Sequence, residues 1–225
     1  MTPARRHFLR VTSERAATAA AAEAPMTHAE ATAQELMLAK LAEDRRRLKQ
    51  VQSMERKAEV KREVLADYVP YVDGVLAANT GRPDDVLMTV MVWRIDAGDS
   101  MGALEIAAYA IEHELPLPDQ YQRTTATLIA EEFSDAAKRA RDGGGASDVS
   151  VLRQVELLTA KADMPDEVRA KLCKELGLGL AGVDRQTALD YLRRAMQLHD
   201  KVGVKKDIER LEREAKNAAA TSSKE

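Results

Sequence analysis

The chain has 225 residues, of which 45% are hydrophobic, 4% aromatic and 32% charged, and its net charge at pH 7 is −3. Its single cysteine, Cys173, excludes a disulfide framework and suits a reducing cytoplasm, and no apolar run is long enough to span a membrane. Abundant Ala and Leu without alternating polar and apolar segments predict an all-α fold.

The charge is distributed unevenly along the chain. Residues 1–66 carry 13 Lys and Arg against 9 Asp and Glu, a net charge of +4. Residues 67–142 carry 6 against 14, a net −8, and residues 143–225 carry 15 against 14, a net +1. The small overall charge argues against strong nonspecific affinity for nucleic acid. The split instead predicts two surfaces, a basic front and an acidic middle.

Residues 1–28 are predicted to be a flexible basic arm. Arg5, Arg6 and Arg10 lie in it, followed by an Ala-rich tract that Pro25 interrupts. Arginine makes two-pronged contacts with phosphate, so this arm is a candidate DNA contact. A solvated terminus is the alternative interpretation.

Residues 29–66 are predicted to form one long helix, because no Gly or Pro occurs between Ala29 and Leu65. Apolar residues recur along it at a heptad-like spacing that polar residues interrupt. Such a broken stripe favours packing beside other copies in a larger assembly over an autonomous coiled coil. The residues expected to mediate oligomerisation are Leu41, Leu48, Val51 and Ala58.

The same helix carries most of the basic residues of the chain's front. A basic helix face can lie along the phosphates of double-stranded DNA. A solvated amphipathic helix is the alternative. The residues expected to contact DNA are Arg45, Arg46, Arg47, Lys49, Arg56 and Lys57.

Residues 67–142 are predicted to form a helical hairpin core. Val86, Val90 and Trp93 recur at helical spacing, the turn Gly98-Asp99-Ser100 follows, and an Ala-rich second helix ends at Pro116. Asp99 or Ser100 is placed to cap that second helix. The pattern is typical of a tetratricopeptide-like hairpin, which is a scaffold for partners.

Residues 146–216 are predicted to form further hairpins after a flexible joint at Gly143–Gly145, and residues 217–225 a disordered tail. Residues 177–182 are expected to form a hinge-like turn. Residues 184–198 echo the first hairpin, but two such units are too few for a solenoid, so a compact domain is expected. One face of the last helix suits docking to a partner's groove through Ile208, Leu211 and Ala215.

No catalytic residue, metal ligand or cofactor is predicted. The four histidines form no pair at metal-ligand spacing, and no phosphate-binding loop is present. Asp84 and Asp85 are adjacent carboxylates, but a helix start favours acids for electrostatic reasons alone.

Four segments carry a resemblance to a known family: RRHFLRVTSERAA, DDVLMTVMVWRIDAGDSMGALEIAAYAI, TAKADMPDEVRAKL and VKKDIERLERE. In these segments, and in the same order along nearly the whole chain, the protein resembles the small terminase subunits of bacteriophages of the GpM family. Members are often labelled terminase endonuclease subunits. The tail here lacks a long basic extension, which leaves the front as the expected DNA surface.

The resemblance implies a role in viral genome packaging in the cytoplasm of a bacterial host. Small terminase subunits recognise double-stranded phage DNA, assemble into rings and deliver the DNA to a large subunit with ATPase and nuclease centres. The last helix is then expected to dock to the large subunit. Two alternatives stay open: a catalytic endonuclease with an unrecognised metal site, and a helical adaptor that binds no DNA.

Overall fold

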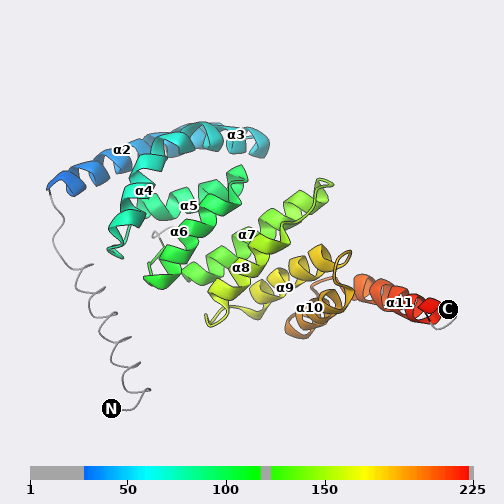
Figure 1. The fold of residues 1–225 in the computed structure, drawn as a ribbon. Coiled ribbons are helices and arrows are strands. Elements are labelled where there is room, and N and C mark those ends of the chain that lie inside the picture. Colours follow the sequence, from blue (N-terminus) through cyan, green and yellow to red (C-terminus); the bar gives the residue numbers. More distant parts are fainter. Residues whose placement is uncertain (1–27, 118–122, 223–225) are drawn as a thin grey trace, which may run out of the picture. The chain divides into compact units, whose positions relative to one another are not determined.

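The computed structural model describes residues 28–117 and 123–222, with side chains from 32 to 117 and from 123 to 217. All regular secondary structure in these residues is helical, which confirms the predicted all-α class (Figure 1). The chain divides into two compact units, residues 1–125 and 126–225, which are described in turn. The predicted basic arm, apart from His28, lies outside the described residues, whereas the predicted tail is described as far as Ser222, where α11 ends.

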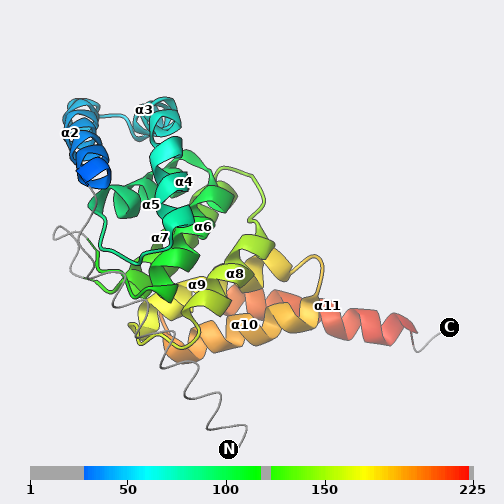
Figure 2. The ribbon, with the colours of Figure 1, turned by 60° about the vertical axis from the view of Figure 1, so that its left-hand side comes forward.

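The single helix expected over residues 29–65 is in fact two helices. Helix α2 spans His28–Gln50 and helix α3 spans Met54–Leu65. Ser53 adopts an extended backbone between them, and its hydroxyl caps α3 by accepting from the backbone N–H of Arg56 at 3.3 Å. The break lets α3 turn back beside α2, as Figure 2 shows, and Val60 and Val64 become buried.

The chain continues from α3 through a short 3₁₀ turn, η1 (Ala66–Tyr68), into α4 (Val69–Ala78). Pro70 lies in the first turn of α4, where its missing N–H costs no helical hydrogen bond. Asn79 ends α4 in the left-handed conformation, with φ of 47°.

Helix α5 (Asp85–Ala97) is the centre of the first unit. The sequence predicts one apolar face, but every residue from Val86 to Ile95 is buried. Helices α2, α3 and α6 all pack against it, so its polar residues are buried as well. Trp93 makes an edge-to-face contact with Tyr68, at 6.1 Å between ring centroids.

Helix α6 (Ser100–Glu112) completes the predicted hairpin. Gly98 ends α5 with a positive φ of 86°, and Asp99 then caps α6 by accepting from the backbone N–H of Gly102 at 3.0 Å. The predicted cap at Asp99 is confirmed. The tetratricopeptide-like character of the hairpin stays a prediction.

The second unit contains the remaining helices of the described chain. They are α7 (Thr125–Asp142), α8 (Val149–Thr159), α9 (Asp166–Leu180), α10 (Arg185–Leu198) and α11 (Lys205–Ser222). The turn expected over residues 177–182 is wrong, because α9 continues to Leu180. A methyl group at Gly177 would lie 2.7 Å from Leu192 and 3.0 Å from the Ala188 carbonyl. Glycine is therefore present inside α9 because α10 approaches it closely.

The apolar face of α11 is part of this unit's core. Ile208 is 7% exposed and Leu211 is 0% exposed, and they pack with Leu180, Leu189 and Leu192. The docking face expected at these residues is therefore occupied by the chain itself. Ala215, the third residue expected there, is half-buried.

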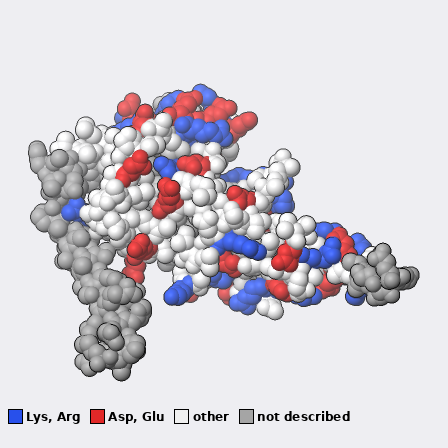
Figure 3. All heavy atoms as spheres, viewed as in Figure 1, with Lys and Arg blue, Asp and Glu red and all other residues white. Residues whose placement is uncertain are grey.

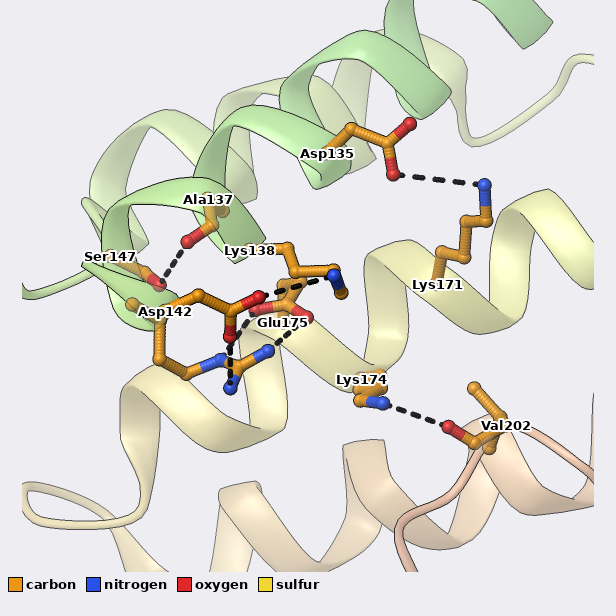
Figure 4. A network of polar contacts seen from close by, with 10 residues as sticks. Asp135, Ala137, Lys138, Asp142, Ser147, Lys171, Lys174, Glu175 and Val202 are labelled. Carbon is orange, nitrogen blue, oxygen red and sulfur yellow. Dashed lines mark hydrogen bonds and ion pairs between the residues drawn. The ribbon is translucent and has the colours of Figure 1, made fainter. Parts of the chain in front are cut away.

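A polar network joins the helices of the second unit (Figure 4). Glu175 on α9 is only 2% exposed and accepts two hydrogen bonds from Arg141 on α7, at 3.2 and 3.3 Å. The pKa of Arg141 is raised above its usual value, because its cation is hydrogen-bonded to this buried carboxylate. Lys174 donates to the Val202 carbonyl at 2.8 Å, which ties α9 to the segment before α11.

Candidate nucleic-acid interface

The basic residues of the front lie on the α2–α3 hairpin, whose geometry is fixed by a buried polar contact. The Tyr68 hydroxyl is fully buried and donates to Asp44 at 2.7 Å. Burial and the nearby Asp44 carboxylate raise the pKa of Tyr68. Lys40 pairs with Asp44 at 3.2 Å and with Asp67 at 2.8 Å, so α2 is held beside the end of α3.

Arg45, a predicted DNA contact, points into the first unit. Its Nη2 donates to Oγ1 of Thr89 on α5 at 2.7 Å, and the side chain is half-buried. Thr89 in turn donates to the Asp85 carbonyl at 2.7 Å. The guanidinium therefore anchors α2 to the central helix.

Arg47 and Arg56, also predicted DNA contacts, lie in a surface ion-pair network. Arg47 pairs with Glu63 at 2.5 Å, and Arg56 pairs with Glu59 at 2.7 Å and with Glu63 at 3.5 Å. Two cations face two carboxylates, so this network adds no net charge to the hairpin. Lys and Arg are interspersed with Asp and Glu over α2 and α3 in Figure 3.

Two further cations of α3 hold the end of α5. Lys61 pairs with Asp96, and Arg62 donates to the Ala97 carbonyl at 3.0 Å. Cations are favoured there because the carbonyl groups at a helix C-terminus carry partial negative charge. These residues serve the fold.

Three of the predicted DNA residues have no partner among the described residues. Arg46 and Lys49 are exposed and Lys57 is half-buried, and the side chain of none of them makes an ion pair or hydrogen bond within the described part of the chain. Arg46 and Lys49 are three residues apart in the last turns of α2, so they share one helix face. The available positive charge of the hairpin is concentrated at these two residues. Arg5, Arg6 and Arg10 lie outside the described residues.

The predicted oligomerisation stripe is mostly used within the chain. Leu41 is 1% and Leu48 is 8% exposed, and Val51 and Ala58 are half-buried. Leu41 and Leu48 therefore need no second copy to remove them from water, because the fold-back of α3 and the contact with α5 bury them. Among the described residues of α2, the large apolar side chains that remain exposed are Leu36, 62% exposed, and Leu38, 41% exposed.

Asp84 has a structural role that the sequence predicts only in part. It caps α5 by accepting from the Leu87 N–H at 2.9 Å, and it also accepts from the Tyr71 hydroxyl at 2.6 Å. The residue is only 6% exposed. Sequence spacing gives no signal for the partnership with Tyr71. Among residues 28–117 and 123–222, no group of three or more His, Cys, Asp or Glu is arranged to hold a metal ion.

Comparisons with known proteins extend over most of the chain. Residues 38–167 match the family described as phage small terminase subunit. The chain is 51% identical over 215 residues to a protein of Escherichia phage P2 named "Terminase, endonuclease subunit", a match that covers 95% of this chain and 85% of that protein. No solved structure matches significantly. In the part of the chain that the structure describes, no helix is long and apolar enough to cross a membrane.

Proposed function

Because the chain belongs to the phage small terminase subunit family, we propose that it is the oligomeric, DNA-binding subunit of a viral packaging complex. In this role it binds double-stranded viral DNA in the host cytoplasm and passes it to a large subunit that carries the ATPase and nuclease centres. Family membership supports the role, and the residues of the α2–α3 hairpin support where the DNA contact lies.

The observation that carries the DNA contact is the pair Arg46 and Lys49. They are exposed cations on one helix face, and no carboxylate in the described chain neutralises them. Two cations per chain give weak binding, but an oligomer presents the pair once per subunit, and linked weak contacts raise the overall affinity. Arg5, Arg6 and Arg10 are proposed to add to the same surface.

Oligomerisation is proposed to use the first half of α2. Leu36 and Leu38 are its exposed apolar residues, whereas Leu41 and Leu48 are enclosed by the chain itself. Each of these leucines would be removed from water by a neighbouring copy that covers it, which favours association. Changing both to Glu should lower the mass of the assembly without lowering the helical content.

Contact with the large subunit is proposed to involve the outer side of α11. Lys206, Glu209 and Arg213 are exposed on that helix, opposite the apolar face that closes the core. Charged residues on an accessible helix face suit a reversible contact with a partner. Reversing the charges of these three residues should weaken co-purification with the large subunit and leave the chain folded.

A catalytic endonuclease is the second candidate, and the name of the phage P2 relative favours it. Incubation of the purified chain with Mg²⁺ and plasmid DNA separates the two functions. Our proposal expects retarded plasmid without strand breaks. Mg²⁺-dependent breaks would support the endonuclease, and no retardation at any salt concentration would support an adaptor that binds no DNA.

A further inference from the structure

The second unit contains a cavity of about 370 Å³ formed by α8, α9 and α10. Leu172 and Cys173 form its apolar part, and both are buried. Tyr191 lies at its wall and donates from its hydroxyl to Glu156 at 2.6 Å. Arg169 and Arg194 also line it, as do Glu156 and Asp190, so the cavity combines an apolar part with two cations and two carboxylates.

The carboxylates of this cavity have partners, whereas its cations pair with no carboxylate of the described chain. Glu156 is bound by Tyr191, and Asp190 accepts from Gln186 at 3.1 Å. Arg169 uses one nitrogen to donate to the carbonyl groups of Thr159 and Ala162, at 3.1 and 2.9 Å, which holds its guanidinium in place. Within the described residues neither Arg169 nor Arg194 makes an ion pair.

The exposed face of α8 extends this surface. Arg153 is exposed, makes no ion pair or hydrogen bond among the described residues, and lies three residues before Glu156, so the two share a helix face. Leu157, next to Glu156, is 74% exposed. Arginine and tyrosine around a cavity are typical of the anchor residues of protein–protein interfaces. We call Arg153, Leu157, Arg169, Tyr191 and Arg194 the arginine surface.

The composition of the arginine surface selects its partner. Neither Arg169 nor Arg194 makes an ion pair within the described residues, so each guanidinium can bind an anion. Because Glu156 and Asp190 also line the cavity, it suits separate carboxylates placed at the arginines better than a continuous phosphate backbone. An acidic protein element with an apolar side chain fits both the cations and the apolar part of the cavity.

The chain itself carries such an element on α6. Met101, Glu105, Ala108 and Glu112 follow one another at helical spacing and share one face of the helix. Met101 is 57% exposed, and Glu105 and Glu112 are exposed without an ion pair among the described residues. The two carboxylates lie about 10 Å apart along the helix axis, at 1.5 Å per residue. We call these four residues the acidic stripe.

We propose that the acidic stripe of one copy docks on the arginine surface of the next copy. The proposal rests on the oligomeric function proposed above and adds a second subunit contact to the one proposed at Leu36 and Leu38. Met101 fills the cavity beside Leu172, and the two glutamates neutralise the arginines. Such a contact joins two different surfaces of the same chain. It is therefore heterologous and closes into a ring when the rotation between neighbours permits.

A charge-swap experiment tests this contact. The variant Glu105→Arg/Glu112→Arg carries two basic surfaces, and the variant Arg153→Glu/Arg194→Glu carries two acidic ones. All four positions are exposed, so both variants should keep the helical content of the wild type. Each variant alone should have an apparent association constant lowered by about tenfold or more. Their equimolar mixture should regain the wild-type mass, because each basic surface then meets an acidic one.

The outcomes separate this contact from the proposed function. A wild-type chain that is monomeric at micromolar concentration in light scattering would contradict oligomerisation itself. A wild-type oligomer whose mass neither variant changes, or variants that the mixture does not rescue, would overturn this contact alone.

Cys173 supplies a second readout, because it lines the cavity and is the one cysteine in the sequence. Burial raises its pKa to about 11, so alkylation is followed at a fixed pH near 9 to keep the thiolate fraction constant. The rate constant should fall as wild-type concentration rises through the assembly range, and should not change for Glu105→Arg/Glu112→Arg. A rate constant independent of concentration while the wild-type mass increases would place the arginine surface outside the contact.

Discussion

Arg45 on α2 donates a 2.7 Å hydrogen bond from Nη2 to Oγ1 of Thr89, a residue 2% exposed on the central helix α5. Arg45 opens the densest basic run of the sequence, yet its cation is used inside the first unit. The next residue, Arg46, is exposed and makes no such contact within the described chain. Of these adjacent arginines, one therefore stabilises the fold, whereas the other is left available for an external anion.

The first prediction compares these two arginines. Arg45→Ala removes the donor to Thr89 and should lower the free energy of unfolding by about 1–3 kcal/mol, as expected for a hydrogen bond to a charged group. Arg46→Ala should change it by less than about 0.5 kcal/mol, as is usual for an exposed surface position. Urea denaturation of both variants measures the difference. Equal stabilities would contradict an anchoring role for Arg45.

The second prediction concerns the contact of α9 with α10. Gly177→Ala places a methyl group 2.7 Å from Leu192 and 3.0 Å from the Ala188 carbonyl, and the backbone atom cannot rotate away. The substitution should therefore lower the free energy of unfolding by about 1–3 kcal/mol despite the higher helix propensity of alanine. Gly182→Ala is the matched control, since nothing lies within 4 Å of the added methyl. A stabilised Gly177→Ala protein would show that the two helices separate readily.

The third prediction concerns Asp84, which joins the cap of α5 to Tyr71. Asp84→Ala removes both acceptors at a buried position and should cost about 1–3 kcal/mol. Tyr71→Phe should cost less, because the cap remains. A double-mutant cycle on the two residues should give a coupling energy of about 0.5 kcal/mol or more. Additive effects would indicate that the 2.6 Å contact contributes little.

The fourth prediction concerns acid stability of the second unit. The pKa of Asp148 is lowered below 3.8 because the Ser150 hydroxyl and the Val151 N–H donate to its carboxylate. The pKa of Asp184 is lowered in the same way by the side chain and backbone of Thr187. A lowered folded pKa stabilises the fold above the unfolded pKa, and that stabilisation is lost as pH falls through the folded pKa.

The urea concentration at the unfolding midpoint of the wild type should therefore decrease as the pH is lowered from about 5 to about 2. In Asp148→Asn/Asp184→Asn the midpoint should fall less steeply, because asparagine keeps an acceptor for each cap but does not titrate. The same slope in both proteins would show that these caps do not contribute to acid unfolding.

The sequence predicts those features of the fold that depend on residues close together in the chain. Asp99 caps α6 as its position after Gly98 indicates, and the lack of alternating segments predicted the helical class. The sequence does not predict the break at Ser53, because no Gly or Pro marks the site and a serine that can cap a helix is a weak signal by itself. Its capping role depends on α3 folding back to bury Val60 and Val64, which is a tertiary effect.

Tertiary packing also explains the other differences. A stripe of apolar residues cannot show whether a helix is covered on its remaining sides, so the burial of Thr89 and Arg94 on α5 was not foreseen. Glycine in a sequence signals a turn and close helix packing equally, and Gly177 is the second case. For the candidate site, composition indicates the basic segment of residues 29–66, but only side-chain contacts separate Arg46 and Lys49 from the cations that stabilise the fold.

We propose that DNA binds at Arg46 and Lys49. The salt dependence of DNA affinity tests this assignment most directly. Fluorescence anisotropy with a labelled duplex, from about 50 to about 200 mM salt, gives the slope of log affinity against log salt for wild type and variants. This slope is negative. In Arg46→Glu/Lys49→Glu its magnitude should decrease by about 2 for each subunit in contact, because each phosphate contact contributes about 0.9. Lys205→Glu/Lys206→Glu, with two exposed lysines at the start of α11, should keep the wild-type slope. An unchanged slope in the first variant, or a loss confined to the second, would contradict the assignment of the DNA surface to α2.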